Sequence, residues 1–369
     1  MKLNKGLKGF THDRLTAIEA RNQAAFIAWG PVVFQASRLM VKFGIFEAIG
    51  QSADGMTRGE IVAATRLSDY AVKCLLEASL CIGTVLVDEE SGRYTLSKTG
   101  WFLLNDPAVH VDMNFNHDVN YEAFFRLEES LLNGKPEGLS HFGPWPTIYE
   151  GLSSLPPHVR QSWLEFDHFY SDSAFPQALH ILFDERRVRT LYDVGGNTGK
   201  WALACVGHDS DVQVTVLDLP QQIAMMRDNI AGKPGAERIS ASPIDLLAPT
   251  SAFPRQEGGV DAIWMSQFLD CFSMEQATDI LLRASQVMTP ATRLYIMETL
   301  WDRQRFEPAA LSLTMTSLYF TVMANGNSKM FNTDDLEQCI HDAGLDVEHI
   351  YDSLGMGHSL MVVRKRRDV

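Results

Sequence analysis

The sequence predicts an α/β fold, in which a doubly wound, Rossmann-like sheet is preceded by an all-helical and winged-helix domain. After residue 189, apolar runs of strand length alternate with helical segments. The first of these runs ends in a glycine-rich turn that leads directly into a helix, and residues 56–104 read as helix, turn, helix and hairpin. Because 369 residues exceed one ordinary domain, we expect two domains, residues 1–110 and 111–369, with residues 111–186 as a helical connector.

Residues 12–48 read as helices with more large apolar side chains than a solvent-facing pair of helices needs. Exposed apolar patches of this size are uncommon on monomers, so we expect this segment to form a homodimer interface. The alternative is that these side chains pack on the second domain of the same chain. They are Phe26, Ile27, Trp29, Val32, Val33, Phe34, Leu39, Met40 and Phe43.

Residues 56–104 predict a winged helix. Thr57 and Ser68 are expected to cap its two helices. Val85–Val87 is expected to pair with Tyr94–Leu96 as the hairpin that forms the wing.

The second helix of this module, residues 69–80, does not have the composition of a DNA-reading helix. Groove binding requires several basic residues, but this helix carries only Lys73 against Asp69 and Glu77. The net charge of −14 and the pI near 5.2 also disfavour nucleic acid and anionic membranes as partners. We therefore expect a structural module, and the alternative is a regulator that binds DNA and senses a small molecule.

Residues 190–199 combine a buried strand, a glycine turn and a helix start, which is the pattern of a nucleotide-binding turn. A dinucleotide fingerprint requires Gly-x-Gly-x-x-Gly, but Asn197 occupies the position of its second glycine. Instead, Asp193 lies two residues before Gly195, and Gly196 and Gly199 follow. An acid at this place suits a cationic ligand without a phosphate, and S-adenosylmethionine fits that description.

A second acid, Asp218, ends the next apolar run and lies 23 residues after Gly195. A carboxylate at this place is the expected ligand of a ribose in any nucleotide-binding βαβ unit. Asp218 therefore supports a nucleotide site without deciding between S-adenosylmethionine and NAD, and an NAD-dependent oxidoreductase remains an alternative.

The carboxyl ends of parallel strands meet at one edge of a sheet, where such folds bind their ligands. We therefore expect Asp218, Asp245, Ser266 and Glu298 to share one edge with the glycine turn. The strands are predicted at residues 190–194, 212–218, 238–242, 260–265 and 293–298, followed by a closing pair at 347–351 and 359–363.

Four stretches together, DVGGNTG, TVLDLP, PIDLL and residues 261–275, resemble motifs of the S-adenosylmethionine-dependent O-methyltransferases that carry an N-terminal winged-helix dimerisation domain. The resemblance implies a homodimeric methyltransferase that acts on a small aromatic or carboxylic metabolite. It further implies that Asp245 accepts the adenine amino group, that Leu246 covers the adenine ring, and that Leu219 and Ser266 belong to the cofactor site.

The chain departs from this family at the residue that acts as the general base. Aligning residues 265–275 puts Asp270 where the family has a histidine, and Ser266 where a lysine often lies. Glu298 matches one glutamate that flanks the histidine, whereas Met330 replaces the other. Three interpretations stay open: Asp270 is a base tuned by burial, the substrate is already nucleophilic, or the bound S-adenosylmethionine serves chemistry other than methyl transfer.

Two helices are candidates for the substrate pocket. In the family, the helix that corresponds to residues 163–170 covers the substrate as a lid. This resemblance implies pocket roles for Phe166, Phe169 and Tyr170. On residues 309–323, Met315, Tyr319 and Met323 share one helical face that suits an apolar ligand. Packing in the protein core is the alternative for both sets.

Neither a metal nor an exported protein is expected. The five cysteines form no Cys-x-x-Cys pair, so we predict no zinc site, no disulfide framework and a reducing cytoplasm. No apolar signal or membrane-spanning segment is apparent. The predicted partners are therefore a small-molecule substrate and a second copy of the chain.

Overall fold

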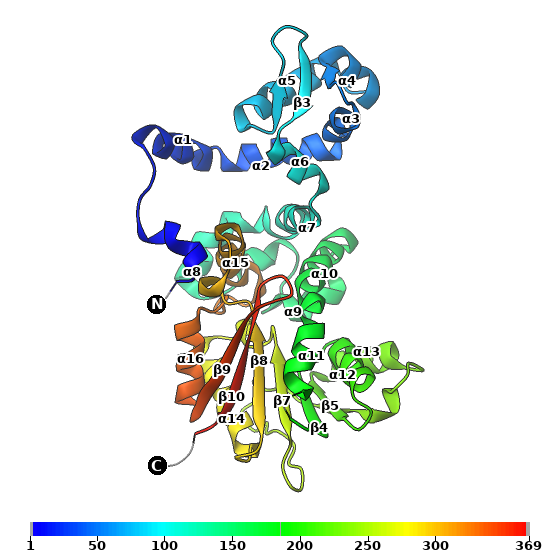
Figure 1. Cartoon of the computed structure of the whole chain (residues 1–369), viewed down its shortest axis with the longest axis vertical. Coiled ribbons are helices and arrows are strands. Elements are labelled where there is room, and N and C mark those ends of the chain that lie inside the picture. The colour runs from blue at the N-terminus through cyan, green and yellow to red at the C-terminus, as the bar shows by residue number, and fades with distance from the viewer. Residues whose placement is uncertain (1–2, 185, 367–369) are drawn as a thin grey trace. The chain divides into compact units, whose positions relative to one another are not determined.

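The computed structural model describes residues 3–184 and 186–366, without the side chains of residues 5, 6, 8, 168, 170 and 171. The chain divides into two compact units (Figure 1). The N-terminal unit comprises residues 13–119 and 161–166, and the C-terminal unit comprises residues 3–12, 120–160 and 167–366. The domain boundary that we expected at residue 110 lies inside the helix α7 (Pro107–Phe115). The helix α10 (Pro157–Ser171) contributes residues to both units.

The N-terminal unit contains the predicted helix–turn–helix and hairpin. Its three-stranded antiparallel sheet has the order β1-β3-β2, and Val85 pairs with Leu96 as expected for the wing. A small core of buried apolar side chains joins α2 to α5 and the sheet. The elements are α1 Ala17–Ala28, α2 Gly30–Lys42, α3 Ile45–Gln51, β1 Met56–Thr57, α4 Arg58–Thr65, α5 Asp69–Ile82, β2 Val85–Val87, β3 Arg93–Leu96, α6 Lys98–Asn105 and α7 Pro107–Phe115.

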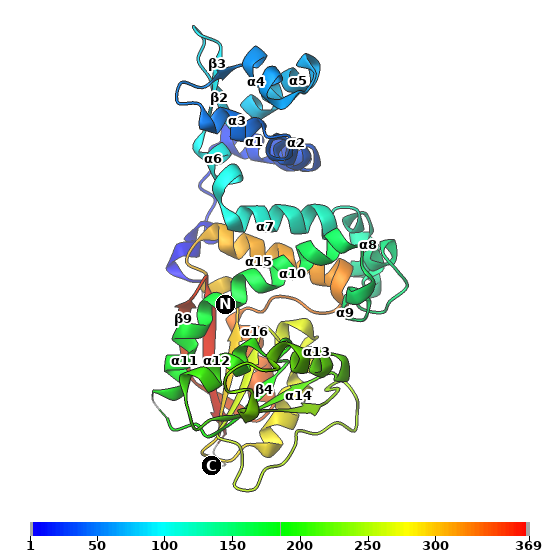
Figure 2. The same ribbon diagram turned by 90° about the vertical axis from the view of Figure 1, so that its right-hand side faces the viewer.

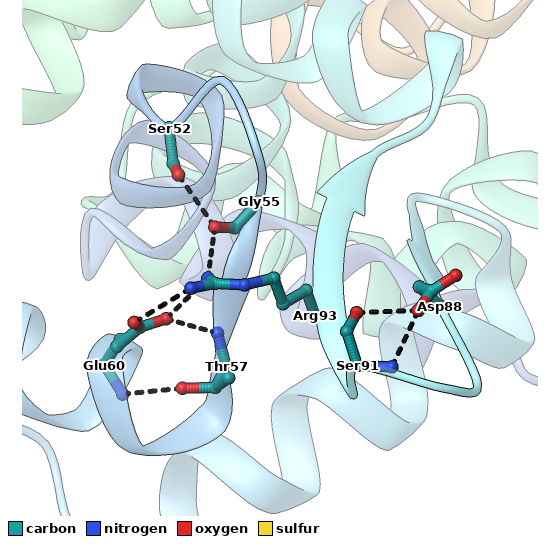
Figure 3. Close-up of polar contacts among 7 residues, drawn as sticks. All are labelled: Ser52, Gly55, Thr57, Glu60, Asp88, Ser91 and Arg93. Carbon is teal, nitrogen blue, oxygen red and sulfur yellow. Dashed lines mark hydrogen bonds and ion pairs between the residues drawn. The ribbon is translucent and has the colours of Figure 1, made fainter.

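One arginine ties the wing to the helices of this unit (Figure 3). Arg93, at the start of β3, donates to the carbonyl oxygen of Gly55 at 2.9 Å and to both carboxylate oxygens of Glu60 at 2.9 and 3.2 Å. Glu60 also accepts from the backbone amide of Thr57 at 2.8 Å, which completes the capping box of α4. Strand, turn and helix are therefore held by one charge-assisted network.

The two helices from the apolar segment 12–48 leave most of their apolar side chains exposed. No side chain of α1 is buried, and Ile27 and Trp29 are 69% and 65% exposed. Met40 of α2, in contrast, is fully buried in the core of the unit. Among the described residues, no single helix is long and apolar enough to span a membrane; α1 and α2 reach that length and composition only as a pair, which is bent by 74°.

The C-terminal unit is built on a seven-stranded sheet of order β6-β5-β4-β7-β8-β10-β9. Its first five strands in this order are parallel, and β10 is antiparallel to both of its neighbours. The predicted doubly wound sheet with a closing antiparallel pair is confirmed. The strands are β4 Thr190–Val194, β5 Gln213–Asp218, β6 Ile239–Pro243, β7 Ala262–Ser266, β8 Arg293–Glu298, β9 Leu345–Leu354 and β10 His358–Lys365.

Helices cover both faces of this sheet, and each face has its own core (Figures 1 and 2). Alternate residues of β4 serve the two cores: Tyr192 and Val194 pack with α14 and α16, whereas Leu191 packs with α11, α12 and α13. The second core includes two stacked indoles, Trp201 of α12 and Trp264 of β7, with ring centroids 4.0 Å apart. The longer helices are α8 Leu127–Asn133, α10 Pro157–Ser171, α11 Phe175–Phe183, α12 Lys200–His208, α13 Pro220–Ile230, α14 Met274–Val287, α15 Glu307–Tyr319 and α16 Thr333–Asp342.

Two glycines of the N-terminal unit allow a controlled test of the wing. Both have left-handed backbone conformations, with φ of +73° at Gly55 and +83° at Gly83. A Cβ at Gly55 would lie 2.5 Å from the carbonyl oxygen of Tyr94, whereas a Cβ at Gly83 would meet nothing within 4 Å. Gly83→Ala should therefore cost only the left-handed strain of roughly 1–2 kcal/mol, and Gly55→Ala should cost about 1–3 kcal/mol more. Calorimetric unfolding of both variants measures the difference, and equal losses would contradict this account.

Candidate active site

A glycine turn connects β4 to α12 at the carboxyl edge of the sheet. The amide of Gly195 donates to the carbonyl oxygen of Leu217 at 2.8 Å, so the turn begins beside the neighbouring strand β5. Gly195 and Gly199 have φ of +72° and +75°, and Gly199 immediately precedes α12. A Cβ at Gly195 would lie 2.4 Å from the ring of Phe268, in the loop after β7. Glycine is therefore required where the turn meets that loop.

Asp218 at the end of β5 fixes the second half of the turn. Its carboxylate accepts from the amide of Asn197 at 2.9 Å and from the amide of Leu219 at 2.8 Å. Burial raises the pKa of Asp218, and these two hydrogen bonds counteract the rise. Asn197 occupies the position of the second glycine of a dinucleotide fingerprint. It adopts a left-handed conformation, with φ of +47°, and its backbone amide donates to Asp218.

Asp193 lies beneath the turn in a buried position. It is 2% exposed, and a Cβ at Gly196 would lie 2.7 Å from its Oδ2 atom. Within residues 3–184 and 186–366, that oxygen has no hydrogen-bond partner. Burial, followed by the nearby charge of Asp218, raises the pKa of Asp193 to about 8. Asp193 is therefore mostly a neutral carboxyl at pH 7, and it lies close against Gly196 of the turn.

The remaining cofactor candidates follow the next strands at the same edge. Asp245, after β6, is exposed, and its Oδ1 accepts from the amide of Leu247 at 2.9 Å. The amide of Ile244 donates to the carbonyl oxygen of Asp218 at 2.8 Å, which keeps the Asp245 loop beside the ribose candidate. Leu246 is buried in the core, and Ser266 is the last residue of β7. The parallel pairing thus brings these residues to one edge.

Glu298 holds the loop that follows β7, residues 267–272, which carries Asp270 and which we call the acidic loop. It is the last residue of β8, is 2% exposed, and its Oε1 accepts from the amides of Phe268 at 3.1 Å and Leu269 at 3.0 Å. The loop also begins in a left-handed conformation at Gln267, whose amide donates to the carbonyl oxygen of Met297 at 2.9 Å. The side chain of Glu298, at the end of β8, therefore positions the loop that follows β7.

Asp270 lies in the short helix Leu269–Cys271 of this loop and is 4% exposed. In the described part of the chain, its Oδ1 atom has no hydrogen-bond partner. Burial raises the pKa of Asp270 to about 7, a hydrogen bond from the Cys271 thiol lowers it, and the charge of Asp167 raises it. Burial and the charge of Asp270 raise the pKa of Glu298 well above its usual range. At neutral pH we therefore expect Asp270 to be close to its midpoint, beside a Glu298 that holds its proton more tightly than an ordinary glutamic acid.

Two polar side chains that the sequence analysis missed extend this acidic pair. The Tyr149 hydroxyl, on α9 (Ile148–Gly151), is hydrogen-bonded to the Cys271 thiol, which is in turn hydrogen-bonded to Asp270. Burial raises the pKa of Tyr149 and of Cys271. Asn325 donates to the carbonyl oxygen of Cys271 at 2.6 Å. The adjacency of Cys271 to Asp270 was visible in the sequence, but nothing there connects Tyr149 to the same loop.

Two family models match the chain. A Dimerisation2-like domain matches residues 21–94, and an O-methyltransferase domain matches residues 173–346. The chain combines a Dimerisation2-like domain with an O-methyltransferase domain. The resemblance predicted from the glycine turn and the motifs around it is confirmed.

Related proteins agree with this assignment. "O-methyltransferase FrzF" from Cladobotryum sp is 26% identical over 279 residues, which are 70% of this chain and 61% of that protein. "Bacteriochlorophyllide d C-20 methyltransferase" from Chlorobaculum tepidum is 26% identical, with 59% of this chain and 61% of that protein covered. The chain thus spans about three fifths of the length of these two relatives. "O-demethylpuromycin-O-methyltransferase" from Streptomyces alboniger is 21% identical, with 88% and 84% covered.

Solved structures share the fold. The S-adenosylmethionine-dependent methyltransferase SibL in its apo form has a TM-score of 0.70 at 23% identity, with 93% of this chain and 98% of that chain covered. The mitomycin 7-O-methyltransferase MmcR has a TM-score of 0.68 at 18% identity, with 94% and 98% covered.

In the O-methyltransferase domain, the residues predicted on α15 and just after it have different environments. Met315 is half exposed, Tyr319 is 4% exposed and Met323 is fully buried. Tyr319 lies near enough to Tyr149 for its charge to raise the pKa of that phenol. Met330 is buried, and its amide donates to the Ser317 hydroxyl at 3.1 Å. Of the predicted helical face, Tyr319 is therefore the residue associated with the acidic loop.

The residues predicted on α10 are not brought together in one described unit. Phe166 belongs to the N-terminal unit and stacks on Phe115 with ring centroids 3.9 Å apart. Phe169 is partly buried in the C-terminal unit, and the side chain of Tyr170 lies outside the described residues. The pocket roles of Phe166, Phe169 and Tyr170 stay predictions.

Proposed function

We propose that this protein is an S-adenosylmethionine-dependent O-methyltransferase of a small aromatic or carboxylic metabolite. One observation carries the proposal: Gly195 of the nucleotide-type turn lies directly against Phe268 in the loop that carries the buried Asp270. A methyl donor on the turn and an acceptor beside Asp270 would therefore be neighbours. Transfer from a sulfonium requires this proximity, because it is an in-line displacement.

The residues at the turn suit the cofactor. Asp218 would bind the ribose hydroxyls, since each carboxylate oxygen can accept more than the one backbone hydrogen bond that it has here. Asp245 is exposed and available to accept from the adenine amino group. Gly195, Gly196 and Gly199 would let the ligand approach the main chain. When bound, S-adenosylmethionine supplies an electrophilic methyl group.

Asp270 is the proposed general base. A phenol with a pKa of about 10 is largely protonated at pH 7, and a carboxylate of ordinary pKa would be a poor base for it. Burial removes about half of that difference by raising the pKa of Asp270 to about 7. Asp270 would take the hydroxyl proton of the acceptor as the acceptor oxygen bonds to the methyl carbon. The bond from that carbon to sulfur would break, and its electron pair would stay on the sulfur of the leaving S-adenosylhomocysteine. Glu298 holds the loop by accepting from the amides of Phe268 and Leu269.

The Dimerisation2-like domain would form a homodimer through α1 and α2. The support is the set of exposed apolar side chains on these helices, including Phe26, Ile27, Trp29 and Val32, all at least 51% exposed. Such a surface is much more apolar than a monomer normally presents to water.

Calorimetric titration tests the cofactor. S-adenosylhomocysteine should bind at micromolar concentration, and NAD should not, because Asn197 replaces the glycine that a pyrophosphate requires. Asp218→Ala should weaken binding by roughly 10-fold or more, since a charge-assisted hydrogen bond contributes about 1.5–3 kcal/mol. Asp228→Ala, a change in an acid of α13 without these contacts, is the matched control. Binding of NAD alone would overturn the proposal in favour of an oxidoreductase.

The pH dependence of the rate tests Asp270. The value of kcat/KM should fall about tenfold per pH unit below pH 7 and level off above it, because only the ionised carboxylate acts as a base. Asp167→Asn should move this limb to lower pH by removing a like charge, and Cys271→Ala should move it to higher pH by removing a hydrogen bond to the carboxylate. Asp270→Asn should reduce turnover by about 10² to 10⁴ with cofactor affinity intact.

Glu298→Gln is the control for this series. The side-chain oxygen of glutamine can still accept from Phe268 and Leu269. Because burial, Cys271 and Asp167 set the pKa of Asp270, the pH below which the rate falls should stay near 7. A flat profile together with a fully active Asp270→Asn variant would instead indicate an acceptor that is already nucleophilic. Binding without methylation of any acid or phenol in a labelled-cofactor screen would indicate other chemistry.

Light scattering tests the dimer. The intact chain should scatter at about twice its mass of 41.3 kDa, and Trp29→Glu should shift the equilibrium towards monomer by placing a charge in the apolar interface. Leu86→Glu, on the exposed strand β2 of the wing, is the matched control and should leave the mass unchanged. A wild-type protein of 41.3 kDa at micromolar concentration would refute the dimer.

A further inference from the structure

Three metal-ligating side chains meet on the surface of the C-terminal unit, away from the glycine turn. His180 lies in the last turn of α11, Asp184 is the C-cap residue directly after that helix, and His208 is the last residue of α12. One potential ligand atom from each of them lies within 4.8 Å of the other two. The His180 Nδ1 and Asp184 Oδ2 atoms are 3.1 Å apart. None of these residues takes part in the proposed methyl transfer.

The apolar core between α11 and α12 fixes the positions of these residues relative to one another. His180 and Asp184 are separated by one helical turn, so they share a face of α11. The helices α11 and α12 lie side by side in both views (Figures 1 and 2) and contribute Leu182 and Cys205 to the same core. The ring of Phe183 lies 5.3 Å from that of His208. The cluster therefore depends on helix packing as well as on surface rotamers.

The donor set determines the class of ion. Two imidazole nitrogens and one carboxylate oxygen suit Zn²⁺ and related transition ions, whereas Mg²⁺ and Ca²⁺ prefer oxygen ligands. Ligand atoms of a tetrahedral zinc ion are about 3.3 Å apart, given Zn–N bonds of 2.0–2.1 Å. The His180–Asp184 separation already matches this spacing, and the exposed His208 ring can rotate towards it.

We propose that His180, Asp184 and His208 form a three-residue Zn²⁺ site whose fourth position is taken by water. No metal was expected from the sequence, because its cysteines are scattered and residues 180 and 208 are separated in the chain. A bound ion would crosslink the end of α11 to the end of α12. Since α12 starts at the glycine turn, the ion would stabilise the helix that supports the turn.

The test uses the full-length protein without a histidine tag, made metal-free with a chelator. Calorimetric titration with ZnCl₂ should give one site per chain with micromolar affinity, and the melting temperature should rise with zinc but not with Mg²⁺. His180→Gln and His208→Gln should each weaken binding by roughly 10-fold or more and remove the shift. Their melting temperatures without metal should equal that of the wild type, because the side chains are exposed.

His141→Gln is the matched control. His141 is an exposed histidine of the same unit, 2.9 Å from the carboxylate of Glu122, and its loss should leave the zinc titration unchanged. Replacement of zinc by Co²⁺ should give the strong visible absorption of a tetrahedral site in the wild type but not in His208→Gln. Equal zinc binding by the wild type and His208→Gln, or no binding at millimolar zinc, would overturn the proposal and leave His180 and Asp184 as a simple ion pair.

Discussion

The candidate site depends on a glutamate that ends one strand and binds the backbone of the loop after the neighbouring strand. Glu298 accepts from two consecutive amides, at Phe268 and Leu269. This places Phe268 against Gly195 and buries Asp270 in the same turn of chain. The cofactor side and the acidic side of the site are thus joined by one carboxyl group. Its burial is tolerable because raised pKa values let the acidic pair carry less than two charges.

The order of the strands and the nature of the turn could be predicted from the sequence because both are local patterns. Strand-length apolar runs, an acid before Gly195 and another at Asp218 each follow from short-range chemistry. The helix caps at Thr57 and Ser68 could also be predicted for this reason. Parallel pairing then does the rest, since it brings the ends of β4 to β8 to one edge.

Contacts between distant segments could not be predicted in this way. Tyr149 precedes Cys271 by more than a hundred residues, and no periodicity relates them. A pKa of Asp270 that is tuned by burial was one of three interpretations of the sequence. The size of the shift depends on how completely the fold buries the carboxyl group. Met315, Tyr319 and Met323 have a helical spacing, but α15 ends at Tyr319 and Met323 lies in the π-helix Phe320–Ala324, so their shared face stays a prediction from that spacing. The spacing does not separate an exposed methionine from a buried one, because exposure depends on what packs around the helix.

The stacked pair Trp201 and Trp264 has a consequence for how this protein can be studied. One indole belongs to the helix that begins at the glycine turn, and the other belongs to the central strand β7, with rings 4.0 Å apart and 17° from parallel. Transition dipoles this close couple, so the pair should contribute an exciton signal to the circular dichroism of the folded chain. Any displacement of α12 against the sheet changes that coupling. The circular dichroism of this tryptophan pair therefore reports on the position of α12 against the sheet, and no external label is needed to follow the motion of that helix.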